Sequence, residues 1–394
     1  MNTTNDRTRN PASVPGLSDG FAKPQGALTQ PLHYRDPANF LRERQAVFGR
    51  TWSFAGMANE IGNANDYVRA NVAGVDVILQ NCGGRLRAFV NSCSHRHSRI
   101  HELPCGNRKL ICPYHGWTYD DEGIPTGIPA RANFPQVCAN PEQFALRQLE
   151  VARVGDFVFS RLEQSGPGLQ EFLGEAWDFL SNASAGLEAK MDDFRGTVGA
   201  NWKVVIENAL EGYHVPLVHR DTLAAINQFS MREDAIVDHL PAGRGHSSMT
   251  NLADAVWLQR WRRFEPSLGV WPFKFDHYVH HHIFPNLTVT SFMGYSFHIQ
   301  VFQPVAVDRT DVHSRIYSVK CEGRTEAGAR IMRSVYEEGQ RFTRKVFAED
   351  QQACALTQQG LQDAERPAVL ASNLEKRIAH FQRFYMQVMA GTTS

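Results

Sequence analysis

The sequence lacks any excess of charge of one sign. Its 394 residues include 41 lysines and arginines against 41 aspartates and glutamates, so the formal net charge is zero. A protein that binds DNA or RNA through a basic surface carries a clear positive excess. We therefore expect no nucleic-acid partner.

Long apolar runs are also missing. No stretch approaches the roughly 18 consecutive apolar residues of a membrane-spanning helix, so no membrane association is expected. The N-terminal stretch contains Asp6, Arg7 and Pro11 in place of the apolar core of a secretory signal. Seven cysteines, an odd number, in a chain without such a signal indicate a reducing compartment. A cytoplasmic location is the expectation.

A nucleotide-binding glycine fingerprint is absent as well. The two glycine clusters, Gly83-Gly84 and Gly243-Arg244-Gly245, are too short to form one. If the chain carries out redox chemistry, its electrons must come from a separate protein.

The pattern of the chain predicts an α+β protein in three parts. Proline-rich polar sequence leads into a helix at 37–49, and short β-rich runs then follow one another at the pace of a compact β domain. After a Gly-Pro linker near 164–168, an amphipathic helix at 169–180, strands at 287–292 and 297–302 and a long helix at 325–362 are expected. The predicted parts are an N-terminal arm and helix at 1–50, a β domain at 51–163 and a larger mixed domain at 164–394.

Two Cys/His pairs mark the β domain. Cys93 and His95 form the first pair, and Cys112 and His115 form the second. Two thiolates and two imidazoles suit zinc or a [2Fe–2S] cluster with mixed ligands. Zinc fingers usually pair Cys with Cys and His with His, whereas here each pair holds one of each. That arrangement favours a cluster in which each loop supplies one ligand to each iron.

A second group of metal-type ligands lies at 201–219. On one straight helix, Glu207, Glu211 and His214 share a face. His219 would point away from His214, but Pro216 breaks the helix and could turn His219 back. The opposite face would be apolar, through Trp202, Val205, Ile206, Ala209, Leu210 and Tyr213.

A carboxylate on the later helix could complete a two-histidine, one-carboxylate ferrous site. Asp350 lies within the apolar stripe of residues 342–361, with Glu349 at its edge. A buried acid needs a partner, and iron would be one. A buried ion pair with Arg344 or Arg366 explains the pattern equally well, so both interpretations stay open at this point.

Together these motifs resemble the Rieske non-haem iron oxygenases, in particular the large (alpha) subunits of aromatic ring-hydroxylating dioxygenases. The resemblance covers residues 35–390. It is carried by Cys93-Ser94-His95-Arg96, by Cys112-Pro113-Tyr114-His115-Gly116-Trp117, by Asn208 to Glu211 with His214 and His219, and by Val346 to Asp350. It implies an antiparallel β Rieske domain joined to a helix-grip-like catalytic domain, in which an antiparallel sheet packs against long helices.

The resemblance also implies the roles of individual residues. Cys93, His95, Cys112 and His115 would bind the [2Fe–2S] cluster, and His214, His219 and Asp350 would bind a mononuclear Fe(II). Asn208 would belong to the catalytic motif. Glu211 would take the bridging position, where most relatives have Asp, and link His115 of one subunit to His214 of the next.

As a terminal oxygenase, the protein would hydroxylate an organic substrate with O2. Electrons would come from a ferredoxin, an NAD(P)H-dependent flavin reductase or both, and the chains would form a homotrimer, with or without a β subunit. An aromatic substrate, as in aromatic hydrocarbon catabolism, is the first expectation. The alternative is a quaternary amine or carnitine-like substrate, because Glu211 resembles the residue of members that act on such amines. An electron carrier without oxygenase activity is less favoured, because it would not need His214 and His219.

Several features stay outside these motifs. His97 stands where many relatives carry glycine, and His97 and His101 are expected to make outer or surface contacts. The run His277–His282 is expected to be a polar strand or loop with surface histidines, although it could line a pocket. Aromatic residues from Trp257 to Phe275 could form a pocket wall or a core. The cysteines outside the two pairs are predicted to be small core residues: Cys82, Cys105, Cys138, Cys321 and Cys354.

Overall fold

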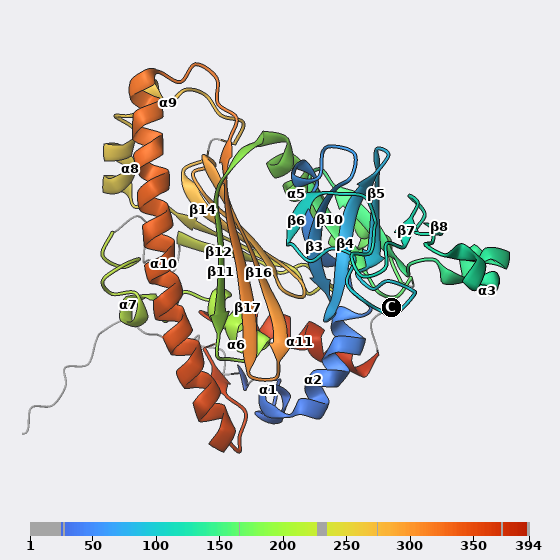
Figure 1. Ribbon diagram of the computed structural model, residues 1–394. Coiled ribbons are helices and arrows are strands. Elements are labelled where there is room, and N and C mark those ends of the chain that lie inside the picture. Colours follow the sequence, from blue (N-terminus) through green and yellow to red (C-terminus); the bar gives the residue numbers. More distant parts are fainter. Residues whose placement is uncertain are drawn as a thin grey trace, which may run out of the picture.

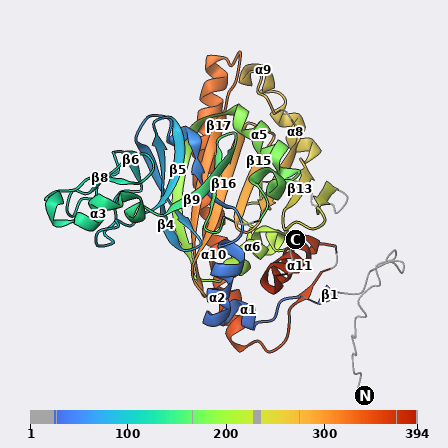
Figure 2. The same cartoon turned by 90° about the vertical axis from the view of Figure 1, so that its right-hand side faces the viewer.

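The computed structural model describes residues 25–26, 28–164, 166–226, 235–273, 275–371 and 373–391. A small β domain lies against one face of a large antiparallel sheet, and a long helix crosses the opposite face (Figure 1). The same layers are visible from the side in Figure 2. The predicted arm at 1–32 lies mostly outside the described residues.

The β domain is built on one antiparallel sheet with the strand order β2-β10-β9-β5-β4-β3-β6. The short β-rich runs expected after the first helix include strands β3, β4 and β5 of this sheet. A short hairpin, β7 with β8, stands beside it. The strands are β2 (Ser53–Met57), β3 (Asp66–Val72), β4 (Val75–Cys82), β5 (Arg85–Val90), β6 (Cys105–Asn107), β7 (Thr118–Tyr119), β8 (Pro125–Gly127), β9 (Gln148–Val154) and β10 (Phe157–Arg161).

The catalytic domain contains a second antiparallel sheet, with the order β11-β17-β16-β15-β14-β13-β12. Sequence neighbours from β12 to β17 pair side by side, as in a meander, and β11 closes the edge against β17. The strands are β11 (Leu187–Val198), β12 (Ile236–His239), β13 (Ser247–Leu252), β14 (His277–Ile283), β15 (Leu287–Phe292), β16 (Ser296–Ala306) and β17 (Arg309–Val319). A further pair joins β1 (Gln25–Gly26) to β18 (Val369–Leu370).

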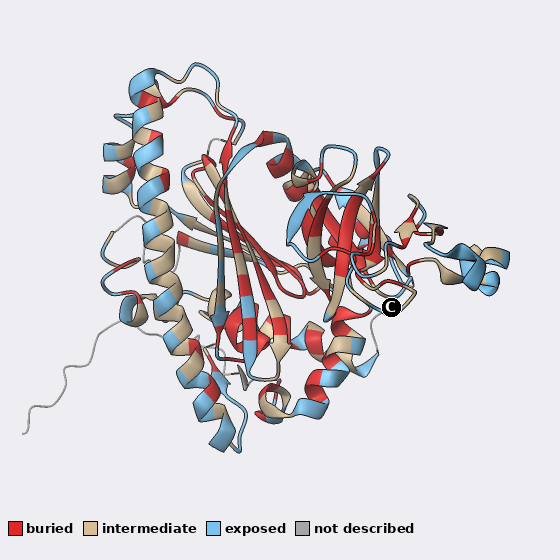
Figure 3. Cartoon of the chain, in the orientation of Figure 1, coloured by how far each residue is buried: buried red, intermediate tan, exposed pale blue. Residues whose placement is uncertain are grey.

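Helices cover the ends and one face of this sheet. The longest helix, α10 (Glu326–Asp363), crosses the sheet obliquely and keeps its exposed residues on the outer side (Figure 3). The helices are α1 (Leu32–Arg35), α2 (Pro37–Glu43), α3 (Pro135–Ala139), α4 (Leu169–Leu173), α5 (Ala176–Gly186), α6 (Trp202–Ala209), α7 (Val215–Val218), α8 (Ala255–Trp261), α9 (Glu265–Leu268), α10 (Glu326–Asp363) and α11 (Lys376–Ala390). Across the part of the chain that the structure describes, no helix combines the length and apolarity needed to cross a bilayer.

The two faces of the catalytic sheet have different neighbours. Ile299 and Val301 of β16 share a buried core with Trp52 and Phe157 of the β domain. We call this side the Rieske-side face. Because side chains alternate along a strand, Phe302 points the other way. It shares a second core with Trp202 of α6, Cys354 of α10 and Phe381 of α11. We call that side the helix-side face.

A buried polar cluster fixes the start of α6. Lys203 and Glu43 are fully buried and form an ion pair of 2.5 Å. The Nε1 of Trp202 donates to the other Glu43 oxygen at 2.8 Å, and the hydroxyl of Tyr385 donates to Glu43 at 2.6 Å. Since a buried charge is tolerated only with such partners, this cluster ties α2 and α11 to the helix that precedes the predicted iron ligands.

Most elements expected from the sequence are present. The helix predicted at 37–49 is α2 followed by a π-helical turn at Arg44–Phe48, and the Asp36 side chain caps it by accepting from the Ala38 amide. The prediction of a single helix at 169–180 was wrong in one respect. It is two helices, α4 and α5, which separate at Gly174, whose φ of 52° lies in the left-handed region that favours glycine.

Candidate functional site

The first site lies on two loops at the edge of the β domain. Cys93 and Cys112 are buried, whereas His95 and His115 are half-buried, and their ring centroids lie 4.6 Å apart. The Gly116 amide donates to the carbonyl of Cys112 at 3.0 Å, which closes a tight turn between the second cysteine and histidine. The loops therefore bring together the four residues that the sequence singled out.

The chemistry of these four side chains fits an iron–sulfur cluster. The Nδ1 atom of His95 is buried and has no hydrogen-bond partner in the described part of the chain. A buried imidazole nitrogen without a partner is unfavourable unless another group, such as a metal, occupies that position. The ring itself is held in place, because His95 stacks on Trp117 at a centroid distance of 5.0 Å.

Tyr119 orders the first cysteine loop. Its hydroxyl lies 3.0 Å from the Cys93 sulfur and 3.0 Å from the Ser94 hydroxyl, and it accepts from the Ser94 amide at 3.1 Å. Burial raises the pKa of the Cys93 thiol, which disfavours a bare thiolate in this pocket. A bound cation would reverse that preference.

His97 has a conformational explanation that the sequence did not provide. Its φ of 60° lies in the left-handed region, where glycine carries no strain and other residues are uncommon. Its amide donates to the carbonyl of Cys93 at 2.8 Å and closes the loop. The side chain is exposed, as expected. For His101, by contrast, the surface alternative is excluded. It is fully buried and stacks on Tyr67 at 3.8 Å.

The second site joins three side chains that are far apart in the sequence. His214, His219 and Asp350 each offer a ligand atom, and these atoms lie within 4.8 Å of one another. The Nε2 atoms of both histidines face the same oxygen, Asp350 Oδ1, at 3.6 Å for His214 and 3.0 Å for His219. Two imidazoles and one carboxylate that converge on one side of a point are the donor set of a non-haem ferrous site.

Further polar residues hold these three side chains. Glu211 contacts the Nδ1 of His214, and Glu349 Oε2 lies 2.7 Å from the Nδ1 of His219. The Thr222 hydroxyl donates to the same Glu349 oxygen at 2.6 Å, and the Asn208 amide donates to Asp350 Oδ1 at 2.8 Å. Such outer partners fix the tautomer and orientation of metal-binding histidines. The role of Glu349 is the main feature that the sequence did not reveal.

These carboxylates change the protonation of His219. Burial alone lowers its pKa, but hydrogen bonds and charge interactions with Asp350 and Glu349 outweigh that effect, so its pKa is raised above the usual 6.5. The site thus attracts positive charge. A cation bound between the three side chains would satisfy it in place of the proton.

The backbone that carries the histidines differs from the helix predicted at 201–219. Helix α6 ends at Ala209, and a turn through Gly212 separates it from α7. Pro216 lies in the first turn of α7, where its missing amide has no helical acceptor to lose, so it begins a helix and does not break one. His214 and His219 stand at the two ends of this single turn, which explains their convergence.

The early break also changes the predicted helix faces. Glu207 does not share a face with Glu211 and His214 in the structure. It accepts from the Tyr34 hydroxyl at 2.6 Å and from the Gln382 amide at 3.0 Å, and burial raises its pKa to about 7. Tyr213, predicted on the apolar face, is 63% exposed. Trp202, Val205, Ile206 and Leu210 are buried as expected.

Arg344, one of the two arginines considered as an ion-pair partner of Asp350, does not bind that carboxylate. Arg344 instead binds Asp192 through both guanidinium nitrogens, at 2.6 and 2.7 Å. Asp350 contacts the two histidines and Asn208. The buried ion pair with Arg344 was therefore a wrong expectation.

The histidine run at His277–His282 is strand β14, but its side chains are not on the surface. His280 and His282 are buried, and His281 stacks on Phe179 at 3.5 Å. The reason is that β14 lies inside the sheet with a strand on either side. The aromatic stretch after Trp257 packs mainly into the core, where Trp271 is buried.

Of the remaining cysteines, Cys82 and Cys354 are buried as predicted. The prediction was wrong for Cys105, which is exposed because it lies on the edge strand β6. Cys138 and Cys321 are half-buried.

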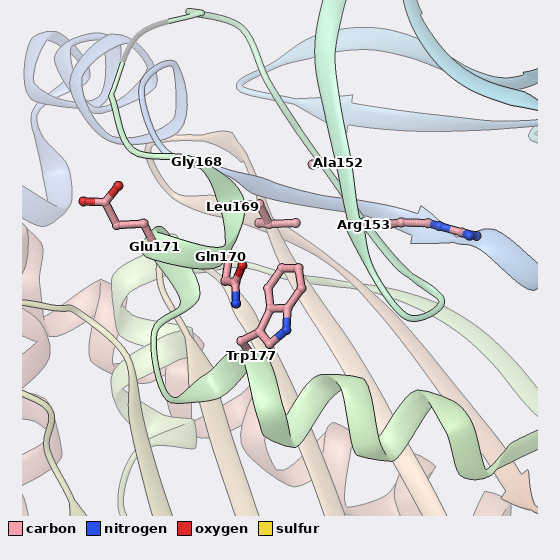
Figure 4. Close-up of a pocket in the computed structure, with 7 residues that line it drawn as sticks. All are labelled: Ala152, Arg153, Gly168, Leu169, Gln170, Glu171 and Trp177. Carbon is pink, nitrogen blue, oxygen red and sulfur yellow. The ribbon is translucent and has the colours of Figure 1, made fainter.

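One hollow of the described structure lies away from both sites. It has a volume of about 580 Å³ and is lined by residues of β9, α4 and α5, among them Arg153 and Trp177 (Figure 4). A second cavity, of about 320 Å³, lies between the β domain and the catalytic sheet, next to Arg315. Neither lining includes a candidate metal ligand, so size alone does not locate the chemistry.

Comparisons with known proteins agree with this geometry. Residues 51–144 match the family model of the Rieske [2Fe-2S] domain, and residues 180–391 match that of the ring hydroxylating alpha subunit (catalytic domain). The subunit alpha of toluate 1,2-dioxygenase from Pseudomonas putida is 27% identical over 77% of this chain and 72% of its own length. The chloroplastic choline monooxygenase of Spinacia oleracea is 28% identical over 65% of this chain and 61% of its own length.

Among solved structures, the quaternary ammonium Rieske monooxygenase CntA in complex with L-carnitine superposes with a TM-score of 0.75. The match covers 93% of this chain and 96% of that one at 20% identity, a level that supports the fold alone. The predicted α+β architecture is confirmed. The catalytic family model covers more than half of the chain, so the protein belongs to the Rieske-type oxygenases, whose alpha subunits combine a [2Fe–2S] domain with a catalytic domain that binds mononuclear iron.

Proposed function

We propose that the protein is a terminal oxygenase that hydroxylates an organic substrate with O2. In this proposal Cys93, His95, Cys112 and His115 bind the cluster, and His214, His219 and Asp350 bind Fe(II). The observation that carries it is the approach of both Nε2 atoms to Asp350 Oδ1. The unpartnered His95 Nδ1 supports the cluster site. The three parts of the chain would be 1–50, 51–163 and 164–394.

When bound, the cluster supplies single electrons, and the mononuclear iron supplies open positions for dioxygen. The side chains around it position the ligands. Glu211 holds the Nδ1 of His214, and Asn208 holds Asp350 by its amide. Glu211 also fits the bridging role between the two centres, because its side chain is nearly buried beside an iron-binding histidine.

The two centres of one chain lie on opposite sides of the catalytic sheet. Figure 1 places the β domain beyond one face, while α7, which follows His214, lies beyond the other near α10. This placement supports electron transfer between neighbouring chains. We therefore propose a homotrimer, with or without a β subunit, in the cytoplasm. A ferredoxin, an NAD(P)H-dependent flavin reductase or both would supply its electrons.

Two substrate classes follow from the family. The first is an aromatic compound, as for the toluate dioxygenase relative. The second is a quaternary amine, as for choline monooxygenase and CntA. The specific observation that favours the second class is Glu211, one methylene longer than the aspartate of most family members.

The decisive experiment combines metal analysis with oxygen uptake. Purified protein should contain three irons and two acid-labile sulfides per chain. With a surrogate reductase it should consume O2 when a panel of aromatic and quaternary-amine substrates is added. Two irons per chain with no substrate-dependent uptake would indicate an electron carrier. A colourless protein with zinc would contradict the proposal altogether.

A further inference from the structure

Three polar side chains form a row across the middle of the catalytic sheet. His280 of β14 lies opposite Thr290 of β15, and Thr290 lies opposite His298 of β16. Neighbouring strands are about 5 Å apart, so the three side chains are direct neighbours. We call them the polar row. Polar residues in the centre of a sheet are unusual, because central strands normally carry apolar side chains.

The polar row faces the helices and not the β domain. His298 has the same orientation as Phe302, four residues further along β16, and Phe302 packs on the helix-side face with Trp202 and Cys354. The row therefore lies on the side of the sheet that is covered by α10, the helix that carries Asp350.

The position of the row along α10 follows from a neighbouring contact. In the register, His298 lies opposite Ile316, and Ile316 lies opposite Asp192. Asp192 binds Arg344 of α10. Arg344 precedes Asp350 by six residues, which is a rise of about 9 Å along a helix. Measured along α10, the polar row therefore lies about 9 Å from the level of the proposed iron site, a distance that a small substrate can span.

A buried cation supports one end of the row. Arg377 of α11 is 2% exposed and donates from Nε to Ser247 Oγ at 3.1 Å and from its second terminal nitrogen to His280 Nδ1 at 3.0 Å. Its first terminal nitrogen is buried without a hydrogen-bond partner among the described residues. The nearby Asp238 forms its ion pair with Lys376 at 3.3 Å. The hydrogen bonds of Arg377 thus go to neutral groups, and its charge is balanced only by the longer-range attraction of Asp238, an unusual state for a buried charge.

The contact with Arg377 decides which nitrogen of His280 carries a proton. A guanidinium can only donate, so Nδ1 of His280 accepts and Nε2–H is the donor of the neutral ring. Burial and the charge of Arg377 lower the pKa of His280 well below 6.5, and burial lowers the pKa of His298 to about 4. At pH 7 the imidazoles are neutral, and Arg377 supplies the positive charge.

Other polar atoms on the same face also lack partners. His282 Nδ1 and Thr288 Oγ1 are buried without hydrogen bonds in the described residues, and they lie opposite each other, two positions along from His280 and Thr290. Within the row, Thr290 is hydrogen-bonded to Tyr278, and His298 Nε2 lies 2.6 Å from the Ser314 hydroxyl. The face is therefore rich in donors and acceptors around one cation.

From this arrangement we infer that the polar row binds a carboxylate of the substrate. His280 donates from Nε2–H to a carboxylate oxygen, and Arg377 behind it provides the opposite charge. The inference rests on the proposed function and deepens it, because it makes His280 a specificity-determining residue and the substrate an organic acid. A hydrocarbon could neither accept a hydrogen bond from His280 nor compensate the buried charge of Arg377, which is unfavourable.

The test compares matched ligand pairs that differ in the carboxylate. Binding of benzoate against benzamide, and of glycine betaine against choline, is measured by calorimetry on the metal-loaded protein without reductase or turnover. In at least one pair, the carboxylate should bind about tenfold more tightly or better than the partner that lacks it. The His280→Leu variant should lose that preference, whereas His280→Gln, which keeps a donor, should retain part of it.

The matched control is His281→Leu. His281 is the next residue of the same strand, but it points to the Rieske-side face and stacks on Phe179. This variant should keep the carboxylate preference. Ligands without the carboxylate that bind as well as the acids in both pairs would overturn the inference, as would the absence of binding by either acid. Equal loss of the carboxylate preference in the His280→Leu and His281→Leu variants would also overturn the inference. Metal content and oxygen uptake are scored separately, so a failed binding test leaves the oxygenase proposal standing.

Discussion

The two candidate metal sites orient their histidines in different ways. In the iron site, Nδ1 of His214 contacts Glu211 and Nδ1 of His219 contacts Glu349, so both Nε2 atoms face Asp350. In the β domain, it is Nδ1 of His95 that is buried and without a partner. In the candidate iron site, the nitrogens bonded by the outer carboxylates are the ones that face away from Asp350, whereas the His95 ring is held by its stack on Trp117. The comparison shows that outer carboxylates select the ligand atom in the catalytic domain.

The sites also differ in how their ligands are assembled. Cys93, His95, Cys112 and His115 come from two adjacent loops of one small sheet. His214 and His219 flank one turn of helix, and Asp350 arrives from a long helix that is far away in the sequence. A site built from local loops can keep its geometry when the other domain is perturbed, whereas the iron site depends on the packing of α6 and α10.

Removing one histidine from each site gives the largest effect. His214→Ala should lose the mononuclear iron and lower substrate-dependent O2 uptake by more than about a hundredfold, because loss of an outer partner alone costs 10- to 100-fold. The visible spectrum of the cluster should stay. His95→Ala should do the reverse and lose the cluster colour while one iron per chain remains. Loss of both metals in each variant would show that the two sites do not assemble independently.

An intermediate effect is expected for the outer carboxylate of the iron site. Glu211→Gln keeps the size of the side chain but removes the charge beside His214, so product formation should slow by about tenfold or more while both metals stay bound. Rapid-reaction spectroscopy of cluster reoxidation directly measures the rate at which the cluster loses its electron. The control is Glu338→Gln on α10, where the acid forms an exposed pair with Arg341. Turnover of Glu211→Gln at the normal rate would refute its coupling role.

The smallest effect is a difference in acid stability between the domains. Burial lowers the pKa of His246 to about 4 and that of His282 to about 3 in the catalytic domain, and that of His101 to about 4 in the β domain. Each ring stays neutral in the folded protein, while the unfolded chain takes up protons below pH 6.5. The free energy of unfolding is therefore constant above that pH and falls as the pH drops from 6.5 toward 4.

Each buried histidine contributes a slope of up to about 1.4 kcal/mol per pH unit in that window. The catalytic domain, with at least two such residues, should thus lose stability faster than the β domain, with His101. Denaturant unfolding at pH 7.5 and 5.5 can be followed by cluster absorbance for the β domain and, for the catalytic domain, by tryptophan fluorescence of a variant in which Trp52 and Trp117 are replaced by phenylalanine. An equal shift of both unfolding midpoints would contradict the predicted difference in acid stability between the two domains.

The sequence by itself determined the fold class and the β domain with its two Cys/His pairs. These follow from short spacings and from strand and helix periodicity, which depend on local geometry. The set of seven candidate ligands, Asp350 included, followed from the resemblance to the Rieske oxygenases. Only the tertiary structure decided where α6 ends, that Pro216 begins α7, that Glu349 holds His219 and that His280 and His282 are buried. Each of these depends on segments that meet across the fold, such as α10 against α7 or β14 between its neighbours, and contacts of that kind leave no periodic signal in the chain.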